Sequence, residues 1–315
     1  MSITIVIPVK NDAGRLRSCL ASITRIAGAN APAIVVADNG SSDDSPAVAA
    51  AAGARVLRVP DVPVGVLRNE AARSASSSLL AFIDADHEIG PGWFDAAGES
   101  FQDPAVAAAG ALYLSPPGGT WVQSMYGALR GQTVGTHETG WLGSGNMLVR
   151  RDVFERLNGF DTSLEACEDV DLCRRIRAAG MKVIADERFR SVHHGDPPTL
   201  GALFRAERWR GRDNLRVSLR GPFDFRDLPS IVTPLLTLAG MVALIPGLLG
   251  FGPAMVFAGA TAFLLLGLIA IRTARMVARL NDGSPVTLAR AFLVGVTYEA
   301  ARAIALVTRA PHHRQ

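Results

Sequence analysis

Three carboxylates and a histidine stand within five positions of one another in the stretch FIDADHEIGPGWF, residues 82–94. Asp84, Asp86 and Glu88 alternate along the chain, and His87 lies among them. A folding core gains nothing from such a cluster, because like charges repel and an uncompensated buried carboxylate is costly. Carboxylate oxygens after an apolar strand suit Mg²⁺ or Mn²⁺, which usually complete their shells with substrate phosphates. The stretch is therefore a candidate divalent cation site, and because many surface turns contain such a triplet, the surrounding pattern has to decide.

The elements that would position this stretch are short β-rich runs alternating with apolar patterns of helical spacing. The expected strands are Ile3–Val9, Ala33–Ala37, Arg55–Val59 and Leu79–Asp84, and the expected helices include Ala13–Ala27 and Val64–Ser77. Such alternation predicts an α/β fold with a mostly parallel sheet and right-handed crossover connections. Ligands of these sheets bind beyond the carboxyl ends of the strands.

Polar clusters fall at three of these strand ends. Lys10-Asn11-Asp12 follows the first strand, the segment Asp38–Asp44 follows the second, and Asp84–Glu88 follows a later one. Because the carboxyl ends of parallel strands meet at one edge of a sheet, we expect the three clusters to form a single site.

Charge is distributed unevenly along the chain. Residues 1–198 contain 18 Lys and Arg against 23 Asp and Glu, a balance of −5, whereas residues 199–315 contain 14 against 6, a balance of +8. The first part is typical of an acidic globular domain. The second predicts attraction to an anionic surface, and the apolar segments within it favour membrane lipid over nucleic acid as that partner.

The cysteines and the first residues indicate a cytosolic location for the acidic part. Cys19, Cys167 and Cys173 form no ligand-spaced pair, and an odd count without framework spacing fits a reducing compartment. The opening MSITIVIPVKND has the pattern of a first β-strand and lacks the charged, apolar and small-residue regions of a signal peptide.

Residues 199–228 interleave seven arginines with apolar side chains, among them Leu203 and Trp209. This pattern is typical of a helix lying in the membrane interface, with arginines reaching lipid phosphates and the tryptophan at headgroup depth. A solvated basic helix packed against its own domain is the alternative.

From Ile231 to Ile271 the chain contains no charged residue. Each half, Ile231–Gly250 and Pro253–Ile271, has about the 20 residues that a membrane-spanning helix needs. Arginines flank both outer ends of the pair: Arg220 and Arg226 before it, and Arg272, Arg275 and Arg279 after it. By the positive-inside rule we expect a hairpin with cytosolic ends, and thus a multi-pass protein of the cell (inner) membrane. Whether Val286–Thr308 is interfacial or a third span stays open.

Several ordered motifs resemble those of family 2 glycosyltransferases of the GT-A fold, over essentially residues 3–190. They are IPVKN at 7–11, VVADNGSSDDS at 35–45, GVLRNEAARSASSSLLAFIDAD at 65–86, GSGNMLVRRDVFERLNGFD at 143–161 and EDVDLCRRIRAAG at 168–180. The resemblance implies a catalytic domain over 1–198. The arginine and apolar patterns described above add an interfacial segment over 199–228 and a transmembrane hairpin with a C-terminal interfacial helix over 229–315.

The resemblance also implies roles for particular residues at the donor side. A metal held by Asp86 would neutralise the diphosphate leaving group of a nucleotide sugar, with Asp84 toward both the metal and the ribose. Asp38 and Asp12, with Pro8 of the first strand, match positions that contact the nucleoside, although Asp12 could simply be a helix N-terminal acid. Arg68 lies in the nucleotide-contacting segment and could meet phosphate.

At the acceptor side, Asp169 matches the family's proposed base, supported by the adjacent Glu168; plain helix capping is the alternative. Gly145 and Asn146 lie in a loop that resembles the segment shaping the acceptor side, although its glycines could simply form turns. His193, or its neighbour His194, could add a metal or diphosphate ligand, or be structural. For His87 we expect an outer, supporting position at most.

One departure from the family pattern limits the expected activity. Processive membrane members carry Gln-x-x-Arg-Trp on the interfacial helix, whereas this chain has Arg205-Ala206-Glu207-Arg208-Trp209. The tail is also short for a polymer-extruding enzyme. We therefore expect an inverting transfer of one sugar to a lipid or lipid-linked acceptor; a GT-A-like nucleotidyltransferase or a non-catalytic membrane scaffold are the alternatives.

Overall fold

The computed structural model describes residues 2–220 and 228–308. Within them the chain forms two compact units. The first comprises residues 2–116 and 132–195, and the second comprises residues 117–131 together with the described residues from 196 onward. Residues 117–131, which the sequence boundaries assign to the first domain, thus group with the C-terminal helices. Arg226, one of the expected flanking arginines, lies outside the described residues.

The first unit is an α/β structure. Its strands are β1 (Ile3–Val9), β2 (Ala33–Asp38), β3 (Arg55–Arg58), β4 (Leu79–Ile83), β5 (His87–Ile89), β6 (Val106–Gly110), β7 (Thr136–Glu138), β8 (Asn146–Arg150), β9 (Lys182–Asp186) and β10 (Ser191–His193). Its helices are α1 (Ala13–Ala27), α2 (Ser45–Ala51), α3 (Val64–Arg73), α4 (Trp93–Ser100), α6 (Arg151–Arg156) and α7 (Glu168–Ala178), with a 3₁₀ turn at Glu187–Phe189.

The predicted elements agree with the observed ones to within a few residues. The first strand and the first helix have the predicted bounds. The helix expected over Val64–Ser77 ends at Arg73, because the serine-rich run that follows competes for backbone hydrogen bonds and favours caps and turns.

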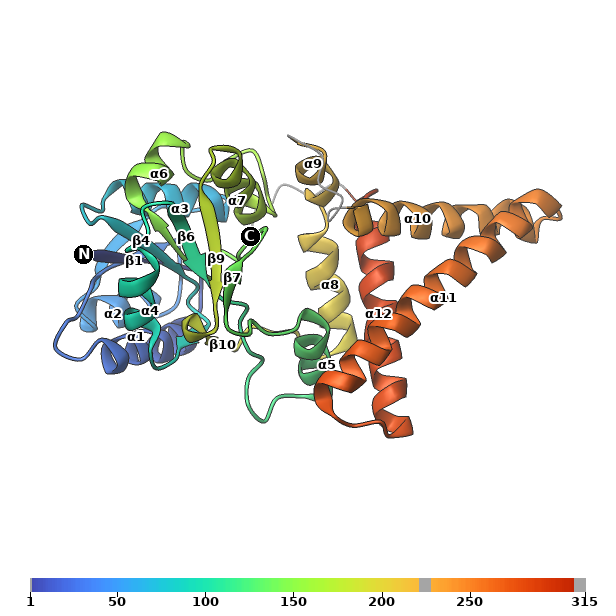
Figure 1. Cartoon of the computed structure of the whole chain (residues 1–315), viewed down its shortest axis with the longest axis horizontal. Coiled ribbons are helices and arrows are strands. Elements are labelled where there is room, and N and C mark those ends of the chain that lie inside the picture. Colours follow the sequence, from blue (N-terminus) through green and yellow to red (C-terminus); the bar gives the residue numbers. More distant parts are fainter. Residues whose placement is uncertain (1, 221–227, 309–315) are drawn as a thin grey trace. The chain divides into compact units, whose positions relative to one another are not determined.

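The main sheet has the strand order β3-β2-β1-β4-β8-β6-β9-β7. Figure 1 labels β1, β4, β6, β9 and β7 of this sheet. Strands β3, β2, β1 and β4 run parallel to one another, and β9 is parallel to β6. Strand β8 is antiparallel to both of its neighbours, and β7 is antiparallel to β9. The prediction of a mostly parallel α/β sheet is confirmed.

Two apolar cores cover the two faces of this sheet. Along β1, Ile5 and Ile7 point into a core shared with α1, α2 and α4, whereas Val6 points into a core shared with α3, α6 and α7. Because successive side chains of a strand point to opposite faces, a strand buried on both sides needs an almost unbroken apolar run. This requirement explains the sequence ITIVIPV of β1.

A second, two-stranded sheet pairs β5 with β10 in antiparallel fashion. Its register sets His193 opposite His87 and Val192 opposite Glu88. Strand β5 begins directly after the Asp84–Asp86 turn, so the pairing brings a late segment of the first unit to that turn.

The second unit consists of helices: α5 (Trp121–Arg130), α8 (Leu200–Arg210), α9 (Asn214–Ser218), α10 (Leu228–Leu248), α11 (Gly252–Leu280) and α12 (Pro285–Ala305). Thr120 begins α5 with a capping box that it forms with Gln123. Val122 and Met125 of α5 pack with Leu203 of α8 and Met276 of α11 in one apolar cluster. Burial of this amphipathic face explains why α5 groups with the later helices.

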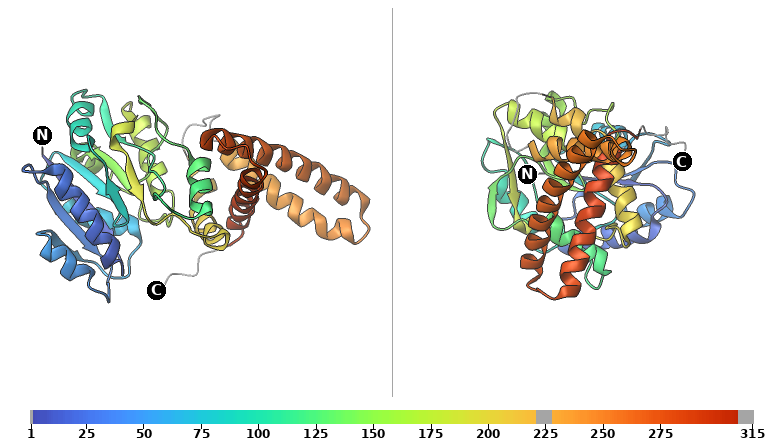
Figure 2. Two further views of the ribbon diagram at one scale, coloured as in Figure 1. Left: turned by 90° about the horizontal axis from the view of Figure 1, so that it is seen from below. Right: turned by 90° about the vertical axis from the view of Figure 1, so that its right-hand side faces the viewer.

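Helices α10 and α11 lie side by side as a hairpin (Figures 1 and 2). Both are long and apolar enough to cross a membrane. Most of their large apolar side chains are exposed, for example Ile245 and Phe263 at 64% and 77%. Gly240 of α10 lies against Thr261 of α11, where a Cβ atom would come within 2.3 Å of the threonine hydroxyl, so a small residue allows the close approach of the two helices.

Candidate functional site

Asp38 stands at the carboxyl edge of the sheet, as the last residue of β2, and is fully buried. Its Oδ1 accepts a hydrogen bond from the Ser41 backbone N–H at 3.0 Å. Its Oδ2 is also buried but accepts no hydrogen bond from the described residues, and the guanidinium Nε of the exposed Arg58 lies 3.9 Å away. Because a buried carboxylate oxygen without a donor is costly, this atom indicates a place for a ligand that donates hydrogen bonds.

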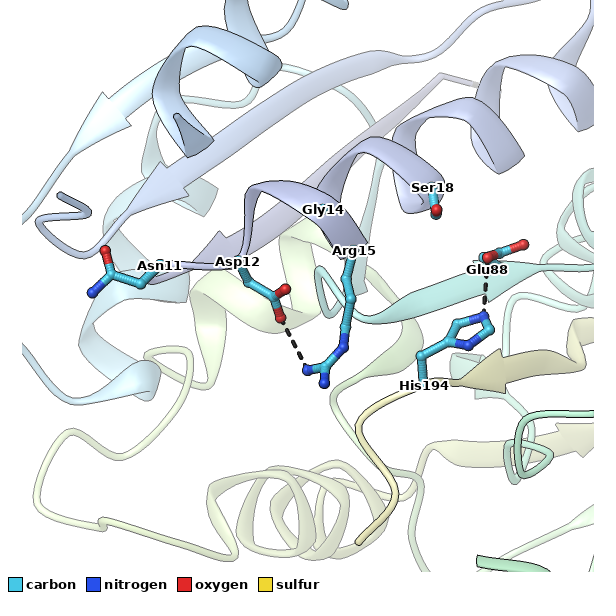
Figure 3. Close-up of a pocket in the computed structure, with 7 residues that line it drawn as sticks. All are labelled: Asn11, Asp12, Gly14, Arg15, Ser18, Glu88 and His194. Carbon is cyan, nitrogen blue, oxygen red and sulfur yellow. Dashed lines mark hydrogen bonds and ion pairs between the residues drawn. The ribbon is translucent and has the colours of Figure 1, made fainter. Parts of the chain in front are cut away.

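A pocket of about 660 Å³ lies beside the first turn of α1 (Figure 3). It is lined by Asn11, Asp12, Gly14, Arg15, Ser18, Glu88 and His194. Asp12 is the N-cap residue of α1, yet its side chain caps no helix N–H; its Oδ2 instead lies 3.2 Å from Arg15 Nη1. His194 Nε2 lies 2.9 Å from Glu88 Oε1. Acidic and basic groups from α1 and the β5–β10 region therefore share this pocket.

Arg68 links two of the predicted site carboxylates. Its guanidinium is buried and donates from Nη2 to Asp84 Oδ1 at 2.5 Å and from Nη1 to Glu168 Oε1 at 2.7 Å. These partners come from the end of β4 and the start of α7. In this structure Arg68 thus acts on the site through two carboxylates that it holds, rather than as an exposed cation facing phosphate.

Glu168 and Asp169, at the start of α7, occupy different environments. Glu168 is buried and also accepts a hydrogen bond from Ser144 Oγ at 3.2 Å. Asp169 is half-buried, and its Oδ2 accepts from the Ser144 backbone N–H at 3.1 Å. Burial, together with the nearby charge of Glu168, raises the pKa of Asp169 to about 7. A carboxylate with such a pKa can take up a proton near neutral pH, as a general base must.

Asp86, His87 and His193 form a cluster in which one possible ligand atom from each lies within 4.8 Å of the others. Asp86 Oδ2 is 3.2 Å from His193 Nε2. Burial opposes ionisation of Asp86, but the hydrogen bond from His193 and the nearby charges of His193, His87 and Arg15 outweigh it, so its pKa is held below the ordinary value. The cluster does not include Asp84, whose Oδ1 is bound by Arg68.

Two glycines leave room around this cluster. A Cβ atom on Gly195 would come within 1.9 Å of Asp86 Oδ2 and 3.0 Å of His193 Nε2. A Cβ atom on Gly145 would lie 2.8 Å from Asp84 Oδ2 and 2.9 Å from His87 Nε2. One carboxylate and two imidazoles are suitable ligands for a divalent ion, and the glycines leave their ligand atoms uncovered, so the residues present fit a metal.

The sequence predicted only an outer, supporting position for His87, yet the structure includes it in this cluster. The structure buries it and places its Nδ1 2.9 Å from Ser191 Oγ. Its ring lies against the rings of Tyr113 and His193, with centroids 4.9 Å and 4.7 Å away. The sequence signal for His87 is its position next to Asp86. The pairing of β5 with β10, which brings His193 to His87, could not be predicted from the sequence.

The remaining predicted residues fall into different places. Pro8 lies in β1 next to Ala37 of β2, near the carboxyl edge. Gly145 lies beside His87 of the Asp86–His87–His193 cluster. Asn146, expected on the acceptor side, is fully buried: its Oδ1 accepts from Trp93 Nε1 at 3.0 Å and its Nδ2 donates to the Phe189 carbonyl. Its amide therefore joins core elements and is not presented to an acceptor in this structure.

Comparison with curated proteins finds relatives that match part of the chain. It is 30% identical over 196 residues to the pre-mycofactocin glycosyltransferase of Mycobacterium tuberculosis, which covers 58% of this chain and 40% of that protein. It is 33% identical over 151 residues to the O-antigen biosynthesis protein RfbC of Myxococcus xanthus, covering 41% of this chain and 12% of that protein. The chain thus spans less than half the length of either relative.

Solved structures share the fold. A mannosyltransferase of Pyrobaculum calidifontis, in complex with GDP-Man and Mn²⁺, superposes with a TM-score of 0.62 at 18% identity, covering 96% of this chain and 85% of that one. The model of the family described as glycosyl transferase family 2 matches residues 4–157. These residues contain the strand ends, Arg68 and the Asp84–Asp86 turn described above. The chain is therefore similar to glycosyltransferase family 2 over residues 4–157, and it has a GT-A-like fold.

Proposed function

We propose that this protein transfers a single sugar from a nucleotide-diphosphate sugar to an acceptor hydroxyl, with inversion at the anomeric carbon. The supporting observation is that three carboxylates of the first unit have three different environments. Asp38 has a buried oxygen without a donor, Asp86 stands with two imidazoles, and Asp169 has a raised pKa. Nucleoside binding, leaving-group stabilisation and proton removal need these three environments, respectively.

The donor nucleoside binds at the carboxyl ends of β1 and β2 in this proposal. The uncompensated Asp38 Oδ2 accepts a hydrogen bond from a base N–H or a ribose hydroxyl, which offsets the cost of burying it. Asp12 and the pocket around Arg15 extend this surface beside α1. Asp84 stays available through Oδ2 while Arg68 holds Oδ1.

A bound Mg²⁺ or Mn²⁺, held by Asp86 and His193, would supply positive charge to the diphosphate as it leaves. Residues around the Asp86–His193 pair keep the two side chains suited to binding such an ion. His193 keeps Asp86 ionised through the hydrogen bond at 3.2 Å, and Gly195 leaves both ligand atoms uncovered.

Asp169 removes the proton from the acceptor hydroxyl. Two backbone N–H groups, of Ser144 and Val170, orient its carboxylate at 3.1 Å and 2.8 Å. Arg68 neutralises Glu168, the neighbour of Asp169, and also binds Asp84. The proposed base, Asp169, and the donor-side carboxylate, Asp84, are therefore held at a fixed distance from each other. Direct attack of the activated hydroxyl on the face opposite the diphosphate would invert the anomeric configuration.

A lipid or lipid-linked acceptor is the class that the second unit favours. The exposed apolar side chains of α10 and α11 form a surface that is costly in water and suited to a bilayer. Near them along the chain, Arg205, Trp209, Arg216 and Leu219 are exposed on α8 and α9 or just after them. Arginines that reach phosphates and a tryptophan at headgroup depth are typical of an interfacial segment.

In this proposal α10 and α11 cross the inner membrane as a hairpin, with the catalytic unit in the cytoplasm. Cysteine labelling tests it in a background without the native cysteines. A cysteine at Gly252, in the turn, should react with an impermeant reagent from outside, and one at Ser41 should not. Labelling of both positions from outside would contradict the topology.

Activity is tested by a screen of purified protein against nucleotide sugars with Mn²⁺ or Mg²⁺, with release of nucleoside diphosphate as the measurement. Asp86→Ala should abolish both hydrolysis and transfer while the fold persists, because the side chain serves a ligand and not the core. Asp152→Ala, at an exposed position in the first turn of α6, is the matched control and should keep full activity. Full activity of Asp86→Ala, or of the wild type in excess chelator, would contradict the proposal.

A further inference from the structure

We propose that Trp141 is the platform on which the acceptor lays a sugar ring, so that the protein extends a saccharide and does not glycosylate a sugar-free lipid. The inference rests on the proposed function, because it takes Asp169 as the base. Among the Phe, Tyr and Trp side chains of the described residues in the first unit, only that of Trp141 is exposed, at 45%. Single exposed apolar residues are common, so this exposure matters only because of where the ring stands.

The chain at Trp141 leads directly to the proposed base. Gly143 stands two positions later, and a Cβ atom there would lie 3.9 Å from Asp169 Oδ2 and 3.4 Å from Tyr113 Cε1. The Ser144 backbone N–H donates to the same Asp169 oxygen at 3.1 Å. Because two residues span at most about 7 Å, the Cα atoms of Trp141 and Gly143 lie within that distance of each other. An acceptor whose hydroxyl meets Asp169 can therefore reach the indole with the same sugar ring or the next one.

Anchored neighbours on both sides fix the backbone of Trp141. Thr139 donates its backbone N–H to the Val183 carbonyl of β9 at 2.9 Å, and its hydroxyl donates to the Trp141 carbonyl at 3.3 Å. On the other side, Leu142 is buried in the apolar core that the first unit builds on that face of the sheet. The exposed ring thus stands on a held segment, and binding to it costs less ordering entropy than binding to a mobile loop would.

The surroundings of the ring suit a sugar better than a lipid chain. Gly140 precedes it, where a Cβ atom would lie 3.6 Å from Arg177 Nη1, and Glu138 is exposed nearby along the chain. Val134, the other large apolar residue exposed in the described part of the first unit, precedes β7, whereas Trp141 follows that strand. A lipid chain needs a continuous apolar surface. A pyranose has an apolar face of C–H groups and a rim of hydroxyls, which match an aromatic ring bordered by polar groups.

Binding of methyl glycosides to the full-length protein in detergent tests this. Saturation-transfer-difference NMR with the methyl glycosides of glucose, galactose, mannose, N-acetylglucosamine and rhamnose shows which sugar protons contact the protein. In the wild type, protons on one face of the ring should receive the most saturation. Trp141→Ala should raise the dissociation constant of the best glycoside by at least about tenfold, and Trp141→Tyr should recover part of the loss because an aromatic face remains. Val134→Ala, at the other exposed apolar position, should change nothing.

Transfer kinetics give a second measurement that a merely structural role would not move. The methyl glycosides and farnesol, a sugar-free lipid alcohol, serve as acceptors. The wild type should prefer a glycoside, and Trp141→Ala should raise the KM for that glycoside far more than it lowers kcat. The affinity for nucleoside diphosphate, measured alongside, shows whether the donor side of the variant has folded. If Trp141→Ala does not fold, Trp141→Tyr decides through the same split between KM and kcat.

Three results would overturn the proposal. They are a wild type that binds no methyl glycoside, an unchanged dissociation constant in a folded Trp141→Ala, and an equal loss with farnesol, which would assign the ring to a lipid chain. Failure of the proposed function has a different signature: glycosides bind in a manner that depends on Trp141, but no nucleotide sugar is turned over with any acceptor. Transfer to farnesol without glycoside binding would keep the proposed function and remove the sugar subsite.

Discussion

Both units of this protein bury carboxylates, but the two units differ in how many hydrogen-bond and ion-pair partners these carboxylates have. In the helical unit, Glu207 is almost fully buried and accepts from Tyr126 Oη at 2.6 Å and Arg210 Nη1 at 3.0 Å, and Arg302 Nε lies 3.2 Å away. Burial alone would raise its pKa, but the charges of Arg302 and Arg210, with these hydrogen bonds, hold the pKa below its ordinary value. Its charge is fully compensated.

In the first unit, the carboxylates Asp38 and Asp169 have fewer partners than Glu207 has. Asp38 Oδ2 has no hydrogen-bond donor among the described residues, and Asp169 accepts hydrogen bonds only from backbone N–H groups within them. Such groups destabilise the folded state until a ligand or proton arrives. The difference indicates that Glu207 is a structural charge, and it supports the roles proposed above for Asp38 and Asp169.

The largest effect is expected at the proposed base. Asp169→Asn removes the proton acceptor but keeps the shape, so turnover should fall by about 10²–10⁴ while nucleotide affinity barely changes. Steady-state kinetics and calorimetric titration with the nucleoside diphosphate measure the two quantities. An equal loss of nucleotide affinity would move Asp169 to the donor side of the site.

Removing the compensated charge should act on stability instead. Glu207→Ala leaves Arg210 and Arg302 partly buried without their common acceptor, and should lower the free energy of unfolding by about 3–5 kcal/mol. Denaturant unfolding of the protein in detergent measures this. The control is Glu155→Ala, which breaks an exposed i,i+4 pair with Arg151 at 2.8 Å and should cost less than about 1 kcal/mol. Similar losses in both variants would remove the contrast between the units.

The pH dependence of turnover should reveal the pKa of Asp169. Because a base must be ionised to act, kcat/KM should fall about tenfold per pH unit below a pKa of about 7 and level off above it. The measurement is a rate profile from pH 5 to 9 at saturating metal. In Asp169→Asn the residual rate should lose this inflection; a retained inflection would assign it to another group.

The same shift predicts how stability depends on pH. With a pKa raised in the folded state, the folded protein binds more protons than the unfolded one between the ordinary aspartate pKa of about 3.9 and about 7. This group's contribution to stability therefore falls as pH rises through that window. Asp169→Asn should stabilise the protein more at pH 8 than at pH 4, measured by thermal unfolding. An equal change at both values would show that the pKa is not raised.

The smallest change removes one hydroxyl of the compensated cluster. Tyr126→Phe deletes the hydroxyl that donates to Glu207 and accepts from Arg210 Nη1 at 3.0 Å, and it keeps the ring. The cost should be about 1.5–3 kcal/mol, typical of a hydrogen bond to a charged group. Thermal and denaturant unfolding measure it. Turnover per folded molecule should not change, and a large kinetic effect would mean that this cluster also serves the reaction.

Local patterns in the sequence were sufficient for the elements and for most of the acidic edge. The apolar run of β1 and the periodicity of α1 each depend on neighbouring residues, so the bounds of these elements were predicted closely. The uncharged stretch predicted two long apolar helices, but the second of them, α11, continues past Ile271 to Leu280. The carboxylates at the strand ends followed from the same patterns, because parallel strands end at one edge.

Which of these groups meet was decided by tertiary structure alone. His87 and His193 become neighbours only through the register of β5 and β10. Arg68 joins Asp84 to Glu168, which lies 100 positions after Arg68. Asn146 belongs to a motif that resembles the acceptor-side segment of the family, but its side chain is buried and accepts a hydrogen bond from Trp93. Strand register and side-chain burial depend on contacts between segments distant in sequence, and no local periodicity encodes them. The sequence therefore predicted most of the residues at the candidate site, and the packing of the sheet determined which of their side chains contact one another.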